Sequence, residues 1–215
     1  PIIFMQCGPI RYTAAKPAGA PHDLEVLPRS RHARIELPTD AGIQDVFRHL
    51  AKDQARTEAI AAEVRDAVGQ GRKVLVLTER TEHLDAIKTE LDGLLPVPFV
   101  LHGRMSKKQR SALVADLDAL PPDAPRVLLS TGKLVGEGFD HPPLDTLVLA
   151  MPVSWKGTLQ QYAGRLHREH ASKADVRIID FVDTGHPALL RMWDKRQAGY
   201  KAMGYRLGRD MAVTE

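Results

Sequence analysis

Two arginines and a glutamine in the stretch QQYAGRLHR, residues 160–168, have the types and spacing of a phosphate-binding group. Gln161, Arg165 and Arg168 lie at positions i, i+4 and i+7, so a helix would present all three on one face. An arginine guanidinium is a planar fork of donors that suits a phosphate, and Gly164 would let a bulky group approach beside Arg165. We interpret this face as a phosphate clamp. The alternative is a surface helix whose arginines pair with carboxylates.

The other side of the same helix is apolar. Leu159, Tyr162, Ala163 and Leu166 repeat with helical spacing and fall opposite the arginines. They would anchor the helix in a core and leave the guanidinium groups facing outward.

The elements that must position this helix are a series of short apolar runs separated by amphipathic stretches. Such runs are typical of strands buried on both faces of a parallel sheet, and the alternation predicts an α/β fold with helices on both sides. The expected strands are VLVL at 74–77, VPFVL at 97–101, VLLS at 127–130, LVLAM at 147–151 and VRIIDFV at 176–182. The expected helices cover about 53–69, 80–94, 106–119 and 157–168.

Composition predicts one main domain with a short preceding segment. Residues 1–45, rich in Pro and Gly, are expected to hold the end of a preceding domain and a connector, and residues 46–215 the main domain with a helical C-terminal tail. The chain begins without Met or a basic leader, which favours a piece of a longer protein. With 43% hydrophobic residues and no long apolar run, we expect a soluble, cytoplasmic monomer.

Charge and cysteine content exclude several kinds of site. A net charge of +3 does not by itself indicate a nucleic-acid partner. A single cysteine, Cys7, excludes an internal disulfide, and the nine histidines lack paired ligand spacing, so no structural metal is expected.

Loops that follow the strands carry the remaining polar candidates, because functional groups in open parallel sheets lie at the carboxyl ends of strands. Thr78 and Arg80 follow the first run, and HGRMSKKQR follows the second, with Ser106 as the expected N-cap of the next helix. STGKLVGEGFD follows the third, and its glycines permit backbone conformations that a ligand-contacting loop needs. Ordinary turns and a capped helix with a basic first turn are the alternatives.

Taken together, these segments resemble helicase superfamily 2. Q-x-x-G-R-x-x-R is similar to motif VI of the second RecA-like motor domain, and STGKLVGEGFDHPPLDTLVLAMP is similar to motif V. The resemblance covers roughly residues 70–185 and is weaker around motif IV, near Thr78. TERTEHLDAI and MPVSWKGTLQQYAGRLHR add a finer resemblance to bacterial DEAD/DEAH-type helicases, including those fused to primase-like modules.

The resemblance implies roles for individual residues. Arg165 and Arg168, with Gln161, would reach the γ-phosphate of ATP, and Arg168 would act as an arginine finger. Nucleotide contacts are implied for Gly136, Glu137, Gly138 and Asp140, the last near the ribose or the arginine pair. Nucleic-acid contacts are expected for Thr78, Arg80, His102, Gly103, Arg104, Thr131, Trp155 and Lys156. Trp155 packing the helix onto the sheet is an equal alternative to base stacking.

The sequence lacks the parts of a complete ATPase. There is no G-x-x-x-x-G-K-[ST] and no DExH or DExD run, so ATP and Mg²⁺ would be held mainly by a first motor domain outside this chain. The isolated chain is not expected to hydrolyse ATP. The expected function is the second motor domain of an ATP-dependent helicase or translocase, acting on DNA in preference to RNA. A non-catalytic nucleic-acid or protein binding module is the alternative, whereas a dinucleotide enzyme is disfavoured because no G-x-G-x-x-G follows an early strand.

Overall fold

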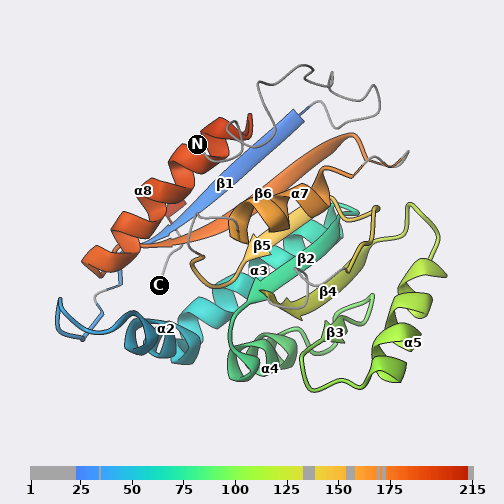
Figure 1. Ribbon diagram of the computed structural model, residues 1–215, viewed down its shortest axis with the longest axis horizontal. Coiled ribbons are helices and arrows are strands. Elements are labelled where there is room, and N and C mark those ends of the chain that lie inside the picture. The colour runs from blue at the N-terminus through green and yellow to red at the C-terminus, as the bar shows by residue number, and fades with distance from the viewer. Residues whose placement is uncertain are drawn as a thin grey trace, which may run out of the picture.

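The chain forms a parallel sheet with helices on both faces (Figure 1). The computed structural model describes residues 23–33, 35–132, 139–153, 158–168, 170 and 173–212. Within them the sheet has eight strands in the order β3-β4-β2-β5-β6-β1-β7, with β8 also paired to β1. Every pairing is parallel. The strands are β1 (Asp23–Arg31), β2 (Lys73–Thr78), β3 (Phe99–Leu101), β4 (Arg126–Thr131), β5 (Thr146–Leu149), β6 (Asp175–Asp183), β7 (Arg206–Leu207) and β8 (Met211–Ala212).

Helices cover the sheet in two groups. The α3 and α4 helices pack on one face with α2 beside them, and α5, α7 and α8 pack on the other. Their bounds are α2 (Ile43–Lys52), α3 (Gln54–Gly69), α4 (Thr81–Glu90), α5 (Lys107–Asp118), α7 (Gln160–Leu166) and α8 (Pro187–Ala202). Among the described helices, none has both the length and the apolar character needed to cross a bilayer.

The central strands divide their side chains between two cores. In β2 every residue is buried. Leu75 and Leu77 face the α5–α7–α8 side, whereas Val74 and Val76 face the α3–α4 side. Each of the five apolar runs overlaps a strand, so the predicted α/β fold with a parallel sheet is confirmed.

Local capping explains where two of the expected helices begin. Ser106 Oγ accepts a hydrogen bond from the Gln109 backbone N–H at 3.2 Å, and Gln109 Oε1 accepts one from the Ser106 N–H at 2.8 Å. This capping box confirms Ser106 as an N-cap. The Asp53 side chain likewise accepts from the Arg56 N–H at 2.9 Å and starts α3.

The β1 strand differs from the expected organisation. The expected preceding domain and connector covers residues 1–45, yet Asp23–Arg31 lies inside this sheet, paired along its whole length with β6. The segment DLEVLPRSR sends Leu24 and Val26 into the core and turns Glu25 and Arg29 to the other face, so it contains no continuous apolar run. Its partner strand lies about 150 residues away along the sequence, so no local pattern marks the pairing. Residues 1–22 lie outside the described part of the chain.

Candidate nucleotide and nucleic-acid interface

The α7 helix separates its apolar and polar side chains as its spacing predicts. Leu159, Tyr162, Ala163 and Leu166 are buried in the core that α7 shares with the sheet. Gln161 is exposed and Arg165 is partly exposed. The helix ends at Leu166, so Arg168 follows it, and its position depends on the segment that comes after the helix.

A hollow of about 360 Å³ lies over the polar face of α7. It is lined by Gln160, Gln161, Gly164, Arg165, His167 and Arg168. These lining residues include two arginines and no carboxylate, which makes the hollow suited to an anion. A Cβ atom placed on Gly164 would meet nothing within 4 Å, so the surface beside Arg165 is open.

Asp140 forms an ion pair with Arg168. The Arg168 Nε and Asp140 Oδ1 atoms are 3.5 Å apart, and the side chains are 55% and 42% exposed. An exposed pair of this kind contributes only about 0–1 kcal/mol, so a phosphate can displace the carboxylate at low cost. Asp140 thus lies beside Arg168, and its contact with a nucleotide stays a prediction. Gly136, Glu137 and Gly138 lie outside the described residues.

Gly132, at the end of β4, lets α7 approach the sheet closely. A Cβ atom on Gly132 would lie 2.0 Å from the Tyr162 hydroxyl oxygen. Burial, together with the charge of nearby Glu79, raises the pKa of Tyr162 to about 12. This contact joins the end of β4 to the helix that carries the arginines. Sequence reasoning missed it, although a glycine directly after a buried strand is a signal of close backbone approach.

Lys173 holds the end of α7, and sequence reasoning missed it as well. Its Nζ donates hydrogen bonds to the carbonyl oxygens of Leu166 at 2.7 Å and Arg168 at 3.0 Å. Burial lowers the pKa of Lys173 to about 8, while the carboxylates of Asp145 and Asp140 act in the opposite direction. A lysine shortly after a predicted helix end is the signal that could have indicated such a cap.

Two of the residues expected at the nucleic acid are instead bound within the domain. Thr78 is 2% exposed, and its Oγ1 lies 3.0 Å from His83 Nδ1. Arg80 donates to the Gln44 backbone oxygen at 2.9 Å and pairs with Glu82 at 3.3 Å. The side chains of Thr78 and Arg80 thus have partners inside the domain, and their contact with nucleic acid stays a prediction. The reason is that Thr78 ends β2 facing α4, and α2 offers a carbonyl to Arg80.

The segment after β3 lies beside the end of β4. Leu101 is paired with Ser130, which brings His102 next to Thr131. His102 Nδ1 accepts a hydrogen bond from the Arg104 backbone N–H at 3.3 Å, while the side chain of Arg104 and the backbone of Gly103 are exposed. The structure thus brings four of the expected nucleic-acid residues together. Trp155 and Lys156 lie outside the described residues.

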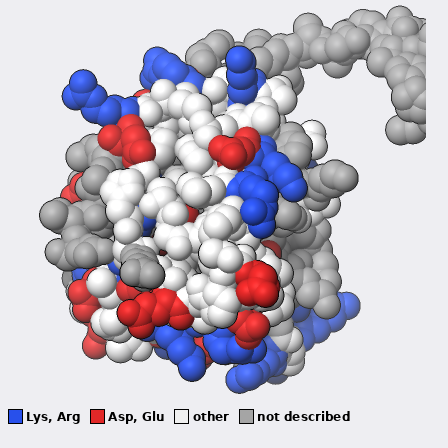
Figure 2. Space-filling model, turned by 90° about the vertical axis from the view of Figure 1, so that its left-hand side faces the viewer, with Lys and Arg blue, Asp and Glu red and all other residues white. Residues whose placement is uncertain are grey.

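Charged side chains of both signs lie on the face drawn in Figure 2. Figure 2 shows one side of the molecule, where basic and acidic side chains are interspersed around a mostly uncharged centre. Among the described residues, no group of three or more His, Cys, Asp or Glu side chains could hold a metal ion.

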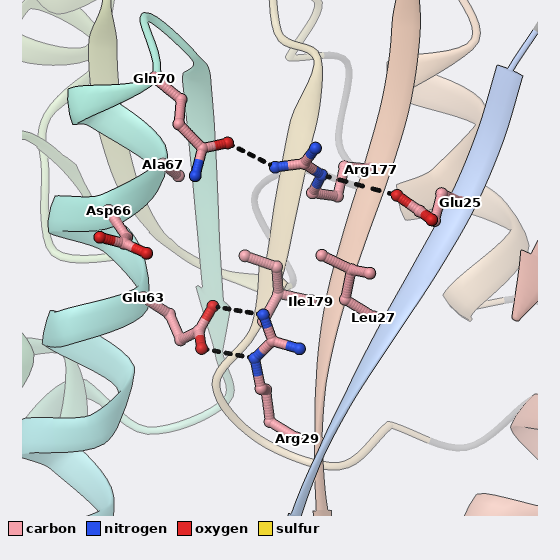
Figure 3. Close-up of a pocket in the computed structure, with 9 residues that line it drawn as sticks. All are labelled: Glu25, Leu27, Arg29, Glu63, Asp66, Ala67, Gln70, Arg177 and Ile179. Carbon is pink, nitrogen blue, oxygen red and sulfur yellow. Dashed lines mark hydrogen bonds and ion pairs between the residues drawn. The ribbon is translucent and has the colours of Figure 1, made fainter. Parts of the chain in front are cut away.

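A second hollow, of about 260 Å³, lies between α3 and strands β1 and β6 (Figure 3). Its charged side chains pair with one another across the space. Arg29 bonds both oxygens of Glu63, and Arg177 donates to Gln70 Oε1 at 2.8 Å and lies 4.0 Å from Glu25. The hollow is on the opposite face of the sheet from α7 and contains both signs of charge, so it does not extend the anion site.

A parallel sheet flanked by helices, with Arg165 on the helix after the fifth strand and Arg168 two residues beyond the end of that helix, has the arrangement of a RecA-like fold. The profile of the helicase conserved C-terminal domain family matches residues 55–170, which is more than half of the chain. The chain therefore belongs to the helicase conserved C-terminal domain family.

Three viral proteins are similar in sequence. The uncharacterized protein 108L of Invertebrate iridescent virus 3 is 37% identical over 100 residues, which are 45% of this chain and 88% of that protein. The transcript termination protein A18 of Fowlpox virus is 28% identical over 63% of this chain. The probable helicase D10 of Escherichia phage T5 is 25% identical over 65% of it. The matched regions are only 29% and 30% of the latter two proteins.

Solved structures share the fold. T4 UvsW superimposes with a TM-score of 0.67 at 16% identity, covering 88% of this chain and 42% of UvsW. Domain 2 of the DEAD-box helicase Mss116p, in a structure titled as bound to an RNA duplex, gives a TM-score of 0.52 at 13% identity over 87% of this chain and 64% of that one. At these identities the likeness concerns the fold alone.

Proposed function

We propose that this chain is the second motor domain of an ATP-dependent nucleic-acid helicase or translocase and supplies its arginine finger. The observation that carries the proposal is the hollow over α7, which Arg165 and Arg168 line, and where the Arg168 guanidinium pairs with Asp140, a carboxylate that is 42% exposed. Charge develops on the γ-phosphate during hydrolysis, and a guanidinium directed at it stabilises the transition state.

In this proposal the domain completes a site that another domain begins. Mg²⁺ and the β- and γ-phosphates would be held by a first motor domain, because this sequence has neither a P-loop nor a DExH run. Arg165 binds the phosphate from the side of α7, and Gln161 hydrogen-bonds next to it. Arg168 leaves Asp140 for the γ-phosphate when the two domains close.

Nucleic acid would run along the ends of β3 and β4. His102, Gly103, Arg104 and Thr131 are neighbours there, and the first turn of α5 adds exposed Lys107 and Lys108. Cationic groups and backbone N–H groups suit contacts to the phosphodiester backbone, which carry no base specificity. We propose DNA as the track. The finer resemblance to bacterial helicases fused to primase-like modules remains a prediction, since the three relatives named above are viral.

The test is Arg168→Ala in the full-length protein, with Arg191→Ala on the exposed surface of α8 as the matched control. We expect the nucleic-acid-stimulated turnover of ATP to fall by roughly 10³-fold or more, with nucleic-acid affinity nearly unchanged. Arg191→Ala should retain both the stimulated turnover and the nucleic-acid affinity. Unchanged turnover in Arg168→Ala would contradict the motor function and favour a non-catalytic binding module.

The choice of track is tested in the same protein. Single-stranded DNA and RNA of matched sequence are compared for stimulation of turnover and for binding. Arg104→Ala should weaken binding of either polymer uniformly across sequences and reduce its salt dependence, because a phosphate contact is lost. Stimulation by RNA alone would correct the assignment to DNA.

A further inference from the structure

The end of α7 depends on one buried ammonium. The last carbonyl groups of a helix have no partner inside it and must be satisfied from outside. Lys173, which is 7% exposed, donates from Nζ to the carbonyl oxygens of Leu166 and Arg168 at 2.7 and 3.0 Å. One bond is to the last residue of the helix and the other is to the candidate arginine finger itself. The backbone from which the Arg168 side chain departs is therefore fixed by Lys173.

Other contacts near Arg168 are less restrictive. Its guanidinium touches Asp140 at 3.5 Å, and both groups are about half exposed. His167, between the two bonded carbonyls, places Nε2 2.8 Å from the Tyr205 hydroxyl and stacks on that ring. Tyr205 orients the His167 side chain, but it leaves the Arg168 carbonyl to Lys173.

Charged groups of both signs surround the ammonium. Asp145 and Asp140 attract it, and Lys73 repels it. Lys73 itself lies 3.6 Å from Asp145, and Arg72 lies 3.2 Å from the same carboxylate. Lys173 in turn repels a proton on His170. Burial is the main reason that Lys173 holds its proton less firmly than an exposed lysine, and the carboxylate of Asp145, which Lys73 and Arg72 also contact, offsets this effect only in part.

We propose that Lys173 is the positioning residue of the arginine finger: its ammonium fixes the carbonyl oxygens of Leu166 and Arg168 and so sets the direction in which the Arg168 guanidinium projects. This inference rests on the proposed function and adds to it a second residue, which never touches the nucleotide. Positioning matters because a displacement of about 1 Å at a catalytic group can reduce turnover on the order of 100-fold.

The charge of Lys173 makes turnover depend on pH. Burial lowers the pKa of Lys173 to about 8, below its ordinary 10.5. Above that pH the group becomes a neutral amine, whose hydrogen bonds to the two carbonyls are no longer assisted by charge. Turnover should therefore decline on the alkaline side. The free energy of unfolding should instead rise with pH between about 8 and 10.5, because in this range the unfolded chain binds the proton that the folded chain has lost.

The experiment compares Lys173→Met and Lys173→Arg in the full-length protein, with Lys201→Met as the control. Lys201 is an exposed lysine in the last turn of α8, so its substitution controls for the removal of a lysine charge away from α7. We expect Lys173→Met to lower the turnover of ATP on the order of 10- to 100-fold, with KM for ATP little changed. Lys173→Arg should restore most of the turnover and remove the alkaline decline, because arginine stays protonated.

Each outcome decides the matter. Wild-type turnover in a folded Lys173→Met protein, or the same alkaline decline in Lys173→Arg as in wild type, would overturn the positioning role. If Lys173→Met does not fold, the pH profile of Lys173→Arg gives the answer alone. Failure of the motor function is recognised separately, because Arg168→Ala would then keep full turnover. Loss of turnover in Arg168→Ala together with normal Lys173 variants would reject only this inference.

Discussion

His83 is a buried side chain whose protonated form is disfavoured in the folded protein. Its ring is fully buried, with Nδ1 3.0 Å from Thr78 Oγ1, and no hydrogen-bond partner for Nε2 exists among the described residues. Burial, followed by repulsion from Arg56, lowers the pKa of His83 to about 3 from 6.5. The folded protein therefore keeps this histidine neutral at pH values where the unfolded chain would protonate it.

The predicted effect is acid destabilisation. Because the folded pKa is depressed, the stability due to neutral His83 is complete above about pH 6.5 and is lost as the pH falls toward 3. His83 contributes at most about 1.4 kcal/mol per pH unit to the slope of the unfolding free energy against pH. In His83→Asn, urea titrations at several pH values should give a shallower fall of the unfolding free energy than in wild type. Exposed His32→Asn is the control, and equal slopes in all three proteins would contradict the prediction.

At the scale of elements, the contact between the end of β4 and α7 depends on the absence of one side chain. The Tyr162 hydroxyl occupies the space that a Gly132 Cβ would need. The same helix contains Gly164, beside which there is open space. Gly132 thus has no room for a methyl group, whereas Gly164 has. Only Gly132 therefore determines how closely α7 packs on the sheet.

Gly132→Ala should lower the free energy of unfolding by about 1–3 kcal/mol, since the methyl group overpacks the contact with Tyr162. Gly164→Ala should be neutral or stabilise by up to about 1 kcal/mol, because alanine is the better helix former. Thermal and chemical unfolding measure both. Adding Tyr162→Phe should recover part of the loss in Gly132→Ala, and a loss that is the same with or without the hydroxyl would show that another contact is responsible.

At the scale of the whole molecule, a buried ion pair connects the sheet to the C-terminal helix. Asp180 on β6 accepts from Arg196 Nε at 2.7 Å and Nη2 at 3.0 Å, and also from the Tyr200 hydroxyl at 2.7 Å. Arg196 is also stacked at 5.5 Å on the Trp193 ring. These contacts hold α8 against β6, so that Tyr200 packs in the same core as the side chains of β1 and β6.

Asp180→Asn should destabilise the protein by about 3–5 kcal/mol, because it leaves the Arg196 charge buried without a counter-ion. The control is Asp23→Asn, which removes one partner of the exposed pair with Arg206, whose side chains are 58% and 65% exposed. That loss should be within about 1 kcal/mol. Denaturant titration compares the two, and similar small losses would contradict the assignment of Asp180 as a structural anchor.

Local sequence patterns were enough to predict much of the fold and the exposed face of α7. Apolar runs marked the five strands around β2 because a strand buried on both faces must be apolar along its own length. The spacing of Leu159, Tyr162 and Leu166 likewise placed Arg165 outward, since a helix repeats every 3.6 residues. These features depend on neighbours in sequence, and they are readable without coordinates.

Tertiary structure decided the rest, because it depends on partners far apart in the chain. The β1 segment has mixed polarity, and it forms a strand only because it pairs with β6, where Leu24 lies beside Val176. Thr78 turns inward because α4 lies beneath it, and no motif records that direction. Lys173 reaches the end of α7 only because the chain turns back into β6. The sequence thus determined the five apolar strands and the outward position of Arg165, whereas three-dimensional packing determined the place of β1 and which long-range hydrogen bonds hold Arg168 in place.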